Sequence, residues 1–354
     1  MGNFIQPFII KDGPVRMVLS NYMMEIPELQ RPYAWEVKNA DELIADLHKI
    51  ESACEQNQVM PQHYLGTVVV TTHAGGSDQV VDGQQRLTTV SVLIGQFIGA
   101  LRSLADAASQ KATLNKNHQV NQQHYQNVSN NCKNLIPNLE QLLWVHDGVD
   151  PQTQKAKFKP RLLVSPEIRK TYELLISGED GEAATYLESK VPAINIRQVA
   201  HTLLNKYIKA PKQGTDFSLL QESEQFQVLR ERFEFVADGL IWVRLATDKA
   251  DAAFELFESL NSKGKPLNVL GLLKVWLLSV LTECQASKQV VSQVAADFRA
   301  LSDDDDDLQV RYFEEFFRMR ALKDPKDGKT AAKQLSLDSR ELIFKDPVLN
   351  GGAI

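Results

Sequence analysis

The sequence predicts a mixed fold of helices and strands, in the α/β or α+β class. Two β-branched stretches, residues 67–72 and 79–81, have the composition of buried strands. They lead into a stretch from Leu87 to Leu101 in which apolar side chains recur at helical spacing. Residues 233–245 return to a strand pattern after a long run of helical patterns.

Composition indicates a globular chain with no overall attraction to nucleic acid. Of its 354 residues, 43% are hydrophobic and 24% are charged, which is ordinary for globular proteins. Lys and Arg total 39 against 45 Asp and Glu, so the formal net charge is -6. Any contact with DNA must therefore use a local basic patch.

Cysteine spacing and hydropathy narrow the class of protein further. Cys54, Cys132 and Cys284 are far apart and form no CxxC pair, which argues against a zinc site and a disulfide scaffold. The N-terminus lacks the segments of a secretion signal, and no apolar run reaches the roughly 18 residues that span a bilayer. We expect a cytoplasmic protein without a membrane partner.

The N-terminal part contains a rigid segment and then an amphipathic helix. Residues 25–35 include two prolines, which exclude helix, together with Tyr33 and Trp35. These aromatic side chains either face a ligand or plug the core, and the sequence leaves both open. From Asn39 to about Gln56, apolar residues recur at helical spacing with acids between them, which predicts a helix with one solvated face.

The later elements follow in order. Residues 106–128 are rich in Gln, Asn, Ser and Lys, and they predict a loop or a frayed helical excursion. Helical patterns recur over residues 165–232 and return over residues 252–260 and 267–281. The acid run 303–307 predicts a solvated linker or a helix N-terminus rather than a metal site, since consecutive acids cannot all converge on one ion.

A short stretch in the middle of the chain alternates cations with an aromatic residue. Lys155, Lys157, Lys159 and Arg161 lie at every second position around Phe158. On a strand this spacing places all four cations on one face. The backbone of DNA could use them, although a solvated strand face is the more common explanation.

The stretch from Val80 to Thr89 carries the most chemistry. It predicts a short strand that ends at Asp82 and Gly83, followed at once by a helix whose first turn contains Arg86. A helix start offers unpaired backbone N–H groups and favours an anion, and Arg86 could bind a phosphate with a bidentate fork. The competing interpretation is that Asp82 only caps the helix and Arg86 is a surface charge.

Several familiar catalytic motifs are absent from the sequence. Residues 263–266, Lys-Gly-Lys-Pro, have the wrong spacing for a P-loop and a proline in place of the hydroxyl that binds magnesium. No HExxH, GxSxG or kinase signature occurs. The last histidine is His201, so the C-terminal third cannot supply a His-Asn-His nuclease.

Four motifs together carry a resemblance to a known family. They are residues 26–35 with Gln-Arg-Pro-Tyr, 63–66 with His-Tyr-Leu-Gly, 81–89 with Asp-Gly-Gln-Gln-Arg-Leu-Thr-Thr, and 257–267. In this order the chain resembles the N-terminal domain of GmrSD-type restriction enzymes.

The resemblance implies a particular domain organisation. The implied domain covers residues 12–283 and has a ParB/sulfiredoxin-like core, a small mixed sheet formed by about 12–105 and 233–283. A helical insertion of about 106–232 interrupts this core, and residues 284–354 form a helical C-terminal extension.

The resemblance also implies an activity, which is hydrolysis of a nucleoside triphosphate coupled to recognition or cleavage of modified foreign DNA in antiviral defence. The expected cofactor is Mg²⁺. The residues that match the family's nucleotide motif are Asp82, Gly83, Gln84, Gln85 and Arg86. Of these we expect Asp82, Gln84, Gln85 and Arg86 to be catalytic and Gly83 to bind the nucleotide. The other expected nucleotide-binding residues are Gln30, Arg31, Tyr33, Trp35, Thr88, Thr89, Asn261 and Lys274.

Chemical roles for these residues follow from phosphoryl transfer, which needs charge neutralisation and a positioned water. Arg31 and Arg86 could hold phosphates, and Gln84 or Gln85 could orient the water. Asp82 could hold that water or a Mg²⁺, which takes only one or two carboxylates. Asn261, for its part, either caps a helix end or contacts the ligand.

The chain departs from the family pattern in two places. Gly271 occupies the position where the family usually has an Asp shortly before Lys274. The chain also lacks the C-terminal His-Asn-His nuclease domain that family members commonly carry, so we expect a truncated chain, a short member or a separate nuclease subunit. The expected macromolecular partner is DNA, and a homodimer is left open.

Two rival functions remain. One is a non-catalytic, NTP-gated DNA-binding module that recruits or regulates a separate nuclease. The other is a sulfiredoxin-like enzyme acting on cysteine, which the absence of any Cys near Asp82 disfavours.

Overall fold

The computed structural model describes residues 9–27, 30–57, 62–72, 76–115, 118–178, 190–249 and 253. The chain divides into two compact units, one formed by residues 1–27 and 31–257 and the other by residues 28–30 and 258–354. All the helices and strands given below belong to the first unit. The predicted helices at 252–260 and 267–281 and the acid run lie outside the described residues, apart from the helical Ala253.

The predicted mixed class is confirmed, because helices pack on a mixed sheet with strand order β1-β8-β3-β4-β2-β7. The strands of this sheet are β1 Ile9–Pro14, β2 Met24–Glu25, β3 His63–Thr71, β4 Asp78–Asp82, β7 Leu162–Leu163 and β8 Leu240–Thr247. β3 pairs in parallel with β8 and antiparallel with β4, and β2 pairs in parallel with β4 and β7. β1 lies antiparallel to β8 at one edge.

The strand prediction for residues 233–245 was wrong in its first half. Residues 222–234 form helix α7 and Phe235–Gly239 a π-helical turn, so β8 begins only at Leu240. Phe233, Val236 and Ala237 are buried at helical spacing. A continuous apolar run is compatible with a buried helix as well as with a strand, and here tertiary packing decides between them.

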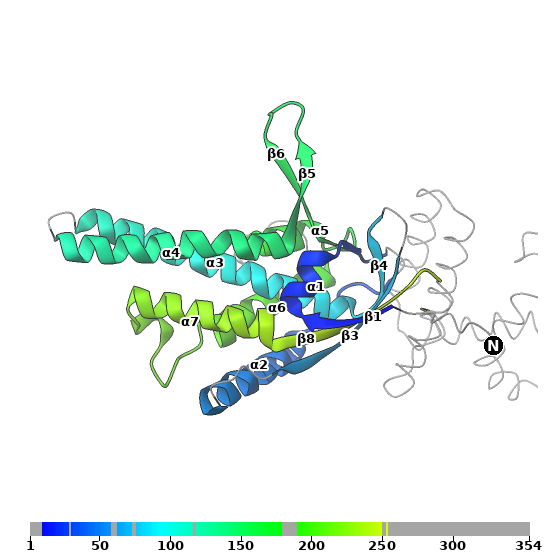
Figure 1. The fold of residues 1–354 in the computed structure, drawn as a ribbon, viewed down its shortest axis with the longest axis horizontal. Helices are drawn as coiled ribbons and strands as arrows, with labels where there is room; N and C mark the ends of the chain where they lie inside the picture. The colour runs from blue at the N-terminus through cyan, green and yellow to red at the C-terminus, as the bar shows by residue number, and fades with distance from the viewer. Residues whose placement is uncertain are drawn as a thin grey trace, which may run out of the picture. The chain divides into compact units, whose positions relative to one another are not determined.

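The helices are α1 Val15–Asn21, α2 Val37–Asn57, α3 Gln84–Leu114, α4 Gln119–Leu143, α5 Arg169–Ile176, α6 Val191–Leu203 and α7 Glu222–Glu234. The helix expected from Asn39 to Gln56 is confirmed as α2. Figure 1 shows α3 and α4 side by side as a long helical hairpin that extends away from the sheet.

Of the two alternatives for residues 106–128, a loop or a frayed helical excursion, the structure shows helix. α3 continues to Leu114 and α4 begins at Gln119. Ala105 and Ala108 of α3 are buried, and the hydroxyls of Ser109 on α3 and Ser129 on α4 form a 2.8 Å hydrogen bond, whereas many polar residues of both helices are exposed. The polar composition therefore marks an exposed helical hairpin instead of an irregular segment.

α3 is the central helix of the core, and almost every side chain from Leu87 to Leu101 is buried. Gly95 and Gly99 allow the end of α5 to approach its backbone closely. Among the described helices, α3 alone is long and apolar enough to cross a membrane, but 83% of its most apolar window is buried inside the fold. Its hydrophobicity is accounted for by its place in the core.

Candidate phosphate-binding site at the start of helix α3

The predicted strand–glycine–helix corner is confirmed. β4 ends at Asp82, Gly83 adopts a left-handed conformation with φ 92°, and α3 begins at Gln84. A Cβ on Gly83 would lie 3.0 Å from the carbonyl oxygen of Thr67 on β3. Glycine is therefore required for both the backbone angle and the close packing against β3.

The first turn of α3 has no side-chain cap. Gly83 occupies the N-cap position, the first turn contains no acid, and the Leu87 N–H bonds the carbonyl oxygen of Gly83 at 3.0 Å. In the part of the chain that the structure describes, the backbone N–H groups of Gln84, Gln85 and Arg86 have no acceptor. This observation removes the alternative in which Asp82 caps the helix, and it leaves donors directed at an anion position.

Arg86 lies on the side of the first turn that faces β3. A Cβ on Gly66 would stand 2.7 Å from Nη1 and 3.1 Å from Cζ of Arg86, so the guanidinium lies against the Gly66 backbone. The side chain is half-buried, and it has no hydrogen bond or ion pair among the described residues. A half-buried guanidinium without a partner is a ready receptor for a phosphate.

Asp82 stands at the same corner as a half-buried carboxyl. Burial raises the pKa of Asp82, and the Gly83 backbone amide and the positive charge of Arg86 oppose that rise without cancelling it. A cation next to this carboxylate would relieve its desolvation cost. Asp82 thus fits the single-carboxylate role that Mg²⁺ bound to a polyphosphate requires, and the described residues contain no cluster of three or more His, Cys, Asp or Glu side chains that would form a different metal site.

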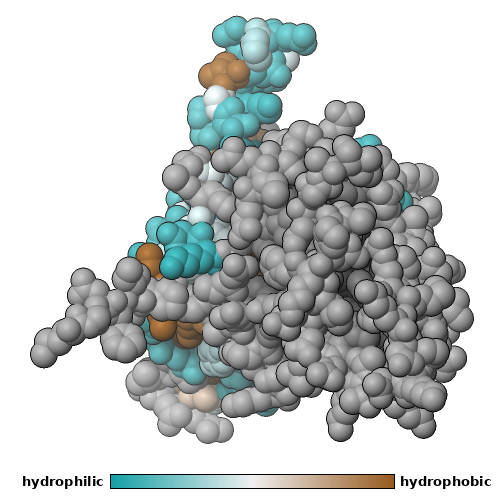
Figure 2. Space-filling model, turned by 90° about the vertical axis from the view of Figure 1, so that its right-hand side faces the viewer, coloured by the Kyte–Doolittle hydropathy of each residue, from teal (hydrophilic) through white to brown (hydrophobic). Residues whose placement is uncertain are grey.

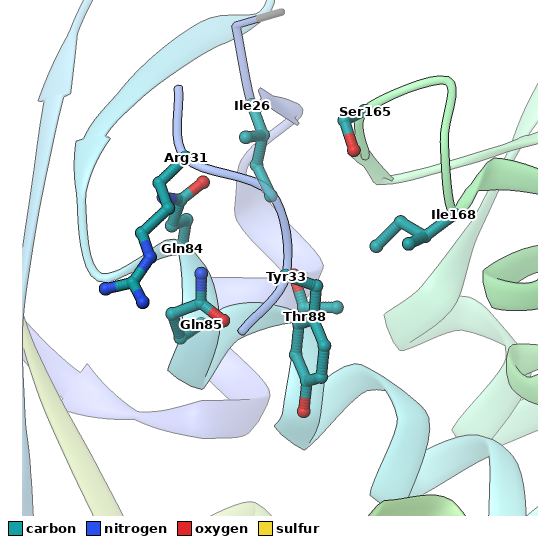
Figure 3. A pocket seen from close by; sticks show the side chains of 8 residues that line it. All are labelled: Ile26, Arg31, Tyr33, Gln84, Gln85, Thr88, Ser165 and Ile168. Atoms are coloured by element: carbon teal, nitrogen blue, oxygen red, sulfur yellow. The ribbon is translucent and has the colours of Figure 1, made fainter. Parts of the chain in front are cut away.

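A small hollow lies on the other side of the first turn of α3. It is open to solvent and its cavity volume is only about 10 Å³, which is about the space of one water. Figure 3 shows that Arg31 comes from the extended segment before α2, whereas Gln84 comes from the first turn of α3. Its lining residues are Ile26, Arg31, Tyr33, Gln84, Gln85, Thr88, Ser165 and Ile168. Arg86 is not one of them, because successive residues of a helix point about 100° apart. The two arginines therefore flank the helix start from different sides instead of sharing one hollow.

The two glutamines of the motif have different environments. The side chain of Gln85 accepts a hydrogen bond from the Ala34 N–H at 2.9 Å and donates one to the Pro32 carbonyl oxygen at 3.2 Å. Gln85 therefore fixes the segment that carries Arg31. Gln84 has no hydrogen bond among the described residues, so its amide remains available to a ligand or a water.

The structure decides the role of Tyr33, which the sequence left open. The Tyr33 side chain is only 4% exposed, and its hydroxyl forms a 2.7 Å hydrogen bond with Oγ1 of Thr89. Thr89 in turn donates to the Gln85 carbonyl oxygen at 2.8 Å. Trp35 packs partly buried against the core and does not line the hollow. Both aromatic side chains thus act as core residues, and Tyr33 also forms the floor of the hollow.

The remaining predicted residues have three different outcomes. Thr88 is buried and lines the hollow. Gln30 belongs to the second compact unit, so the structure does not place it relative to the hollow. Asn261, Lys274 and the departure at Gly271 lie outside the described residues.

Sequence reasoning missed four residues of this region, namely Gly66, Ile26, Ser165 and Ile168. Gly66 did carry a signal, because an isolated glycine inside a strand pattern indicates a bulge or a close approach. The β3–β8 register shifts between Tyr64 and Gly66, and Gly66 has φ 136°. No local pattern marked Ser165 and Ile168, which reach the hollow from the segment after β7.

Comparison with known families supplies one match. The family model described as "GmrSD restriction endonuclease, N-terminal domain" matches residues 15–278. No curated protein matches the chain.

Proposed function

The chain belongs to the GmrSD restriction endonuclease N-terminal domain family, which makes it a module of a restriction system, and on this premise we propose that it is a Mg²⁺-dependent nucleoside triphosphatase. In this proposal, hydrolysis of the NTP is coupled to the recognition or cleavage of modified foreign DNA. The observation that carries it is the uncapped start of α3, whose first turn has free N–H groups and carries Arg86, a guanidinium with no hydrogen bond or ion pair among the described residues.

The residues at this corner supply what phosphoryl transfer requires. Arg86 and the N–H groups of the first turn bind phosphate oxygens, and Arg31 adds a second cation from the edge of the hollow. Gln84 orients the attacking water with its free amide. Asp82 holds Mg²⁺, which would neutralise charge on the polyphosphate when bound. Gln85 is a positioning residue, since both polar atoms of its amide are engaged with the backbone of the Arg31 segment.

The test is phosphate release by the whole chain from each of the common NTPs with Mg²⁺, with and without modified DNA. We expect Arg86→Ala to lower turnover at least a hundredfold, as loss of one preorganised charge in a transition state does. Arg230→Ala is the matched control, because Arg230 is exposed on α7 and only faces Glu234. Wild-type turnover by Arg86→Ala would overturn the proposal.

One observation favours a second candidate, the non-catalytic NTP-gated DNA-binding module that recruits or regulates a separate nuclease. The hollow is far smaller than the 300–1,000 Å³ typical of sites that enclose a whole ligand. In this conformation it does not enclose a complete nucleotide. This module would show no turnover, and a non-hydrolysable NTP would change its DNA affinity as much as the NTP does.

A further inference from the structure

A two-stranded arm projects from the helical hairpin. β5 Trp144–Val149 and β6 Ala156–Pro160 pair only with each other and form a separate antiparallel sheet. We call residues 144–161 the β5–β6 arm. Figure 1 shows it extending from the end of α4, and Figure 2 shows it as a mostly hydrophilic projection with an apolar patch.

The arm is held in shape at its base and at its tip. Arg161 donates through Nε to the Gln141 carbonyl oxygen at 2.8 Å, and its N–H bonds the Leu143 carbonyl oxygen at 2.8 Å. At the tip, the Asp150 carboxylate accepts hydrogen bonds from the N–H groups of Gln152 and Thr153. An isolated hairpin is marginal in water, so these fixed ends help to preserve the ribbon. Its base packs against the core through Trp144, whereas most of its other residues are exposed.

The two faces of the arm differ in chemistry. Lys157 and Lys159 share one face with Asp147, which pairs with Lys159 at 2.9 Å. Phe158 lies on the opposite face, 56% exposed, with its ring edge against His146 at 5.8 Å between centroids.

Lys155 and Lys157 are exposed cations of this surface, and their side chains make no hydrogen bond or ion pair within the described part of the chain. Hydrogen bonds lower the pKa of Asp147 and of Asp150, and the charge of Lys157 contributes to lowering both. The arm carries four cations and two acids, in a chain whose net charge is -6. It is therefore a local exception to the overall charge, as DNA binding by an acidic protein requires.

We propose that the β5–β6 arm binds duplex DNA by entering a groove. A two-stranded ribbon fits the major groove, which is about 12 Å wide. With the Phe158 face toward the base edges, Lys155 and Lys157 reach phosphates along the groove walls on their long, flexible stems. Edge lysines also guard hairpins against aggregation, but that role leaves the exposed Phe158 unexplained. The inference rests on the proposed function in one respect, which is that DNA is the partner. It does not depend on the proposed hydrolysis of an NTP.

The test measures affinity of the whole chain for a labelled duplex at several salt concentrations. The association constant K falls as salt rises, and each phosphate contact contributes about 0.9 to the steepness of log K against log salt. The double variant Lys155→Ala/Lys157→Ala should therefore make this dependence shallower by about 1.8. The affinity deficit of this variant should therefore be about tenfold larger at 50 mM than at 200 mM salt. Phe158→Ser should weaken binding about fivefold or more with the slope unchanged, because it removes a contact with bases and no charge.

The matched control is Lys170→Ala/Lys209→Ala, which removes the same charge from exposed positions outside the arm. An equal loss in this control, or unchanged binding in the arm variants, would overturn the role of the arm. No binding to duplex DNA, or tighter binding to RNA or single strands, would overturn the choice of partner. NTP turnover without DNA should be the same in all arm variants, which separates a failure here from a failure of the proposed hydrolysis.

Discussion

The guanidinium of Arg86 lies against the backbone of Gly66, at a place where a Cβ on Gly66 would stand 2.7 Å from Nη1. Gly66 belongs to β3 and Arg86 to the first turn of α3, so this contact joins two motifs that are separate in the sequence. The absent side chain creates the space in which Arg86 stays half-buried and unpaired. Gly66 thus positions the cation that the proposed phosphate site depends on.

Gly66→Ala should displace Arg86 and lower NTP affinity at least tenfold. The atom that a new Cβ meets is the end of a flexible side chain, so Arg86 moves and the fold survives. The backbone angle, φ 136°, adds strain of about 1–3 kcal/mol for alanine. Calorimetric titration with an NTP and denaturant unfolding measure the two effects separately.

Gly214→Ala is the control for this prediction. Gly214 also has a positive φ, 81°, but a Cβ there would meet nothing within 4 Å. It should lose stability through strain while NTP affinity is unchanged. Equal losses of affinity in both variants would show that the contact with Arg86 has no role.

Gln85→Ala should destabilise the fold, whereas Gln84→Ala should not. Gln85 makes two hydrogen bonds to the backbone of the Arg31 segment, and their loss should lower the free energy of unfolding by about 1–3 kcal/mol. Gln84 makes none within the described residues, so its replacement should change stability by less than about 0.5 kcal/mol. Urea denaturation of both variants measures the free energy of unfolding. Similar losses in the two variants would contradict the role of Gln85 in fixing the Arg31 segment.

Gly95→Ala should destabilise the protein although alanine is the better helix former. A Cβ on Gly95 would overlap the backbone of Leu175 and Ile176 at the end of α5. Alanine gains about 1 kcal/mol in helix propensity, but overpacking a core contact costs about 1–3 kcal/mol and here the obstacle is rigid backbone. A raised midpoint of thermal unfolding in this variant would show that α5 does not pack on α3 in this way.

Asp82→Asn should change how stability depends on pH. Burial raises the pKa of Asp82 above the ordinary value of 3.8, so the folded chain binds this proton more tightly than the unfolded chain does. The contribution of Asp82 to stability is therefore fully present below the ordinary pKa and is lost as pH rises through the raised pKa. Asparagine stays neutral, so the variant should gain stability relative to wild type as pH rises above the ordinary pKa of 3.8. Urea denaturation below and above this pH tests it, and a constant difference between the two proteins would contradict it.

The open alternatives for residues 106–128 and the wrong strand prediction for residues 233–239 have a common cause. Both stretches have a composition that fits more than one local structure: polar residues suit a loop or an exposed helix, and an apolar run suits a strand or a buried helix. In each case the partner that settles the choice is far away in the chain. α4 packs along α3, and the core around Phe97 takes the side chain of Phe233.

The sequence by itself determined the corner at Asp82 and Gly83 and the helix that follows it. These depend on backbone preferences and side-chain spacing within a few residues, which a sequence displays directly. The resemblance to the family was carried by four motifs between residues 26 and 267. Only the tertiary structure separated Gln84 from Gln85, buried Tyr33 in the core and placed Arg86 against Gly66. The hydrogen bonds of Gln85 and Tyr33 join residues more than 50 positions apart, so their roles follow from packing of the whole fold rather than from local pattern.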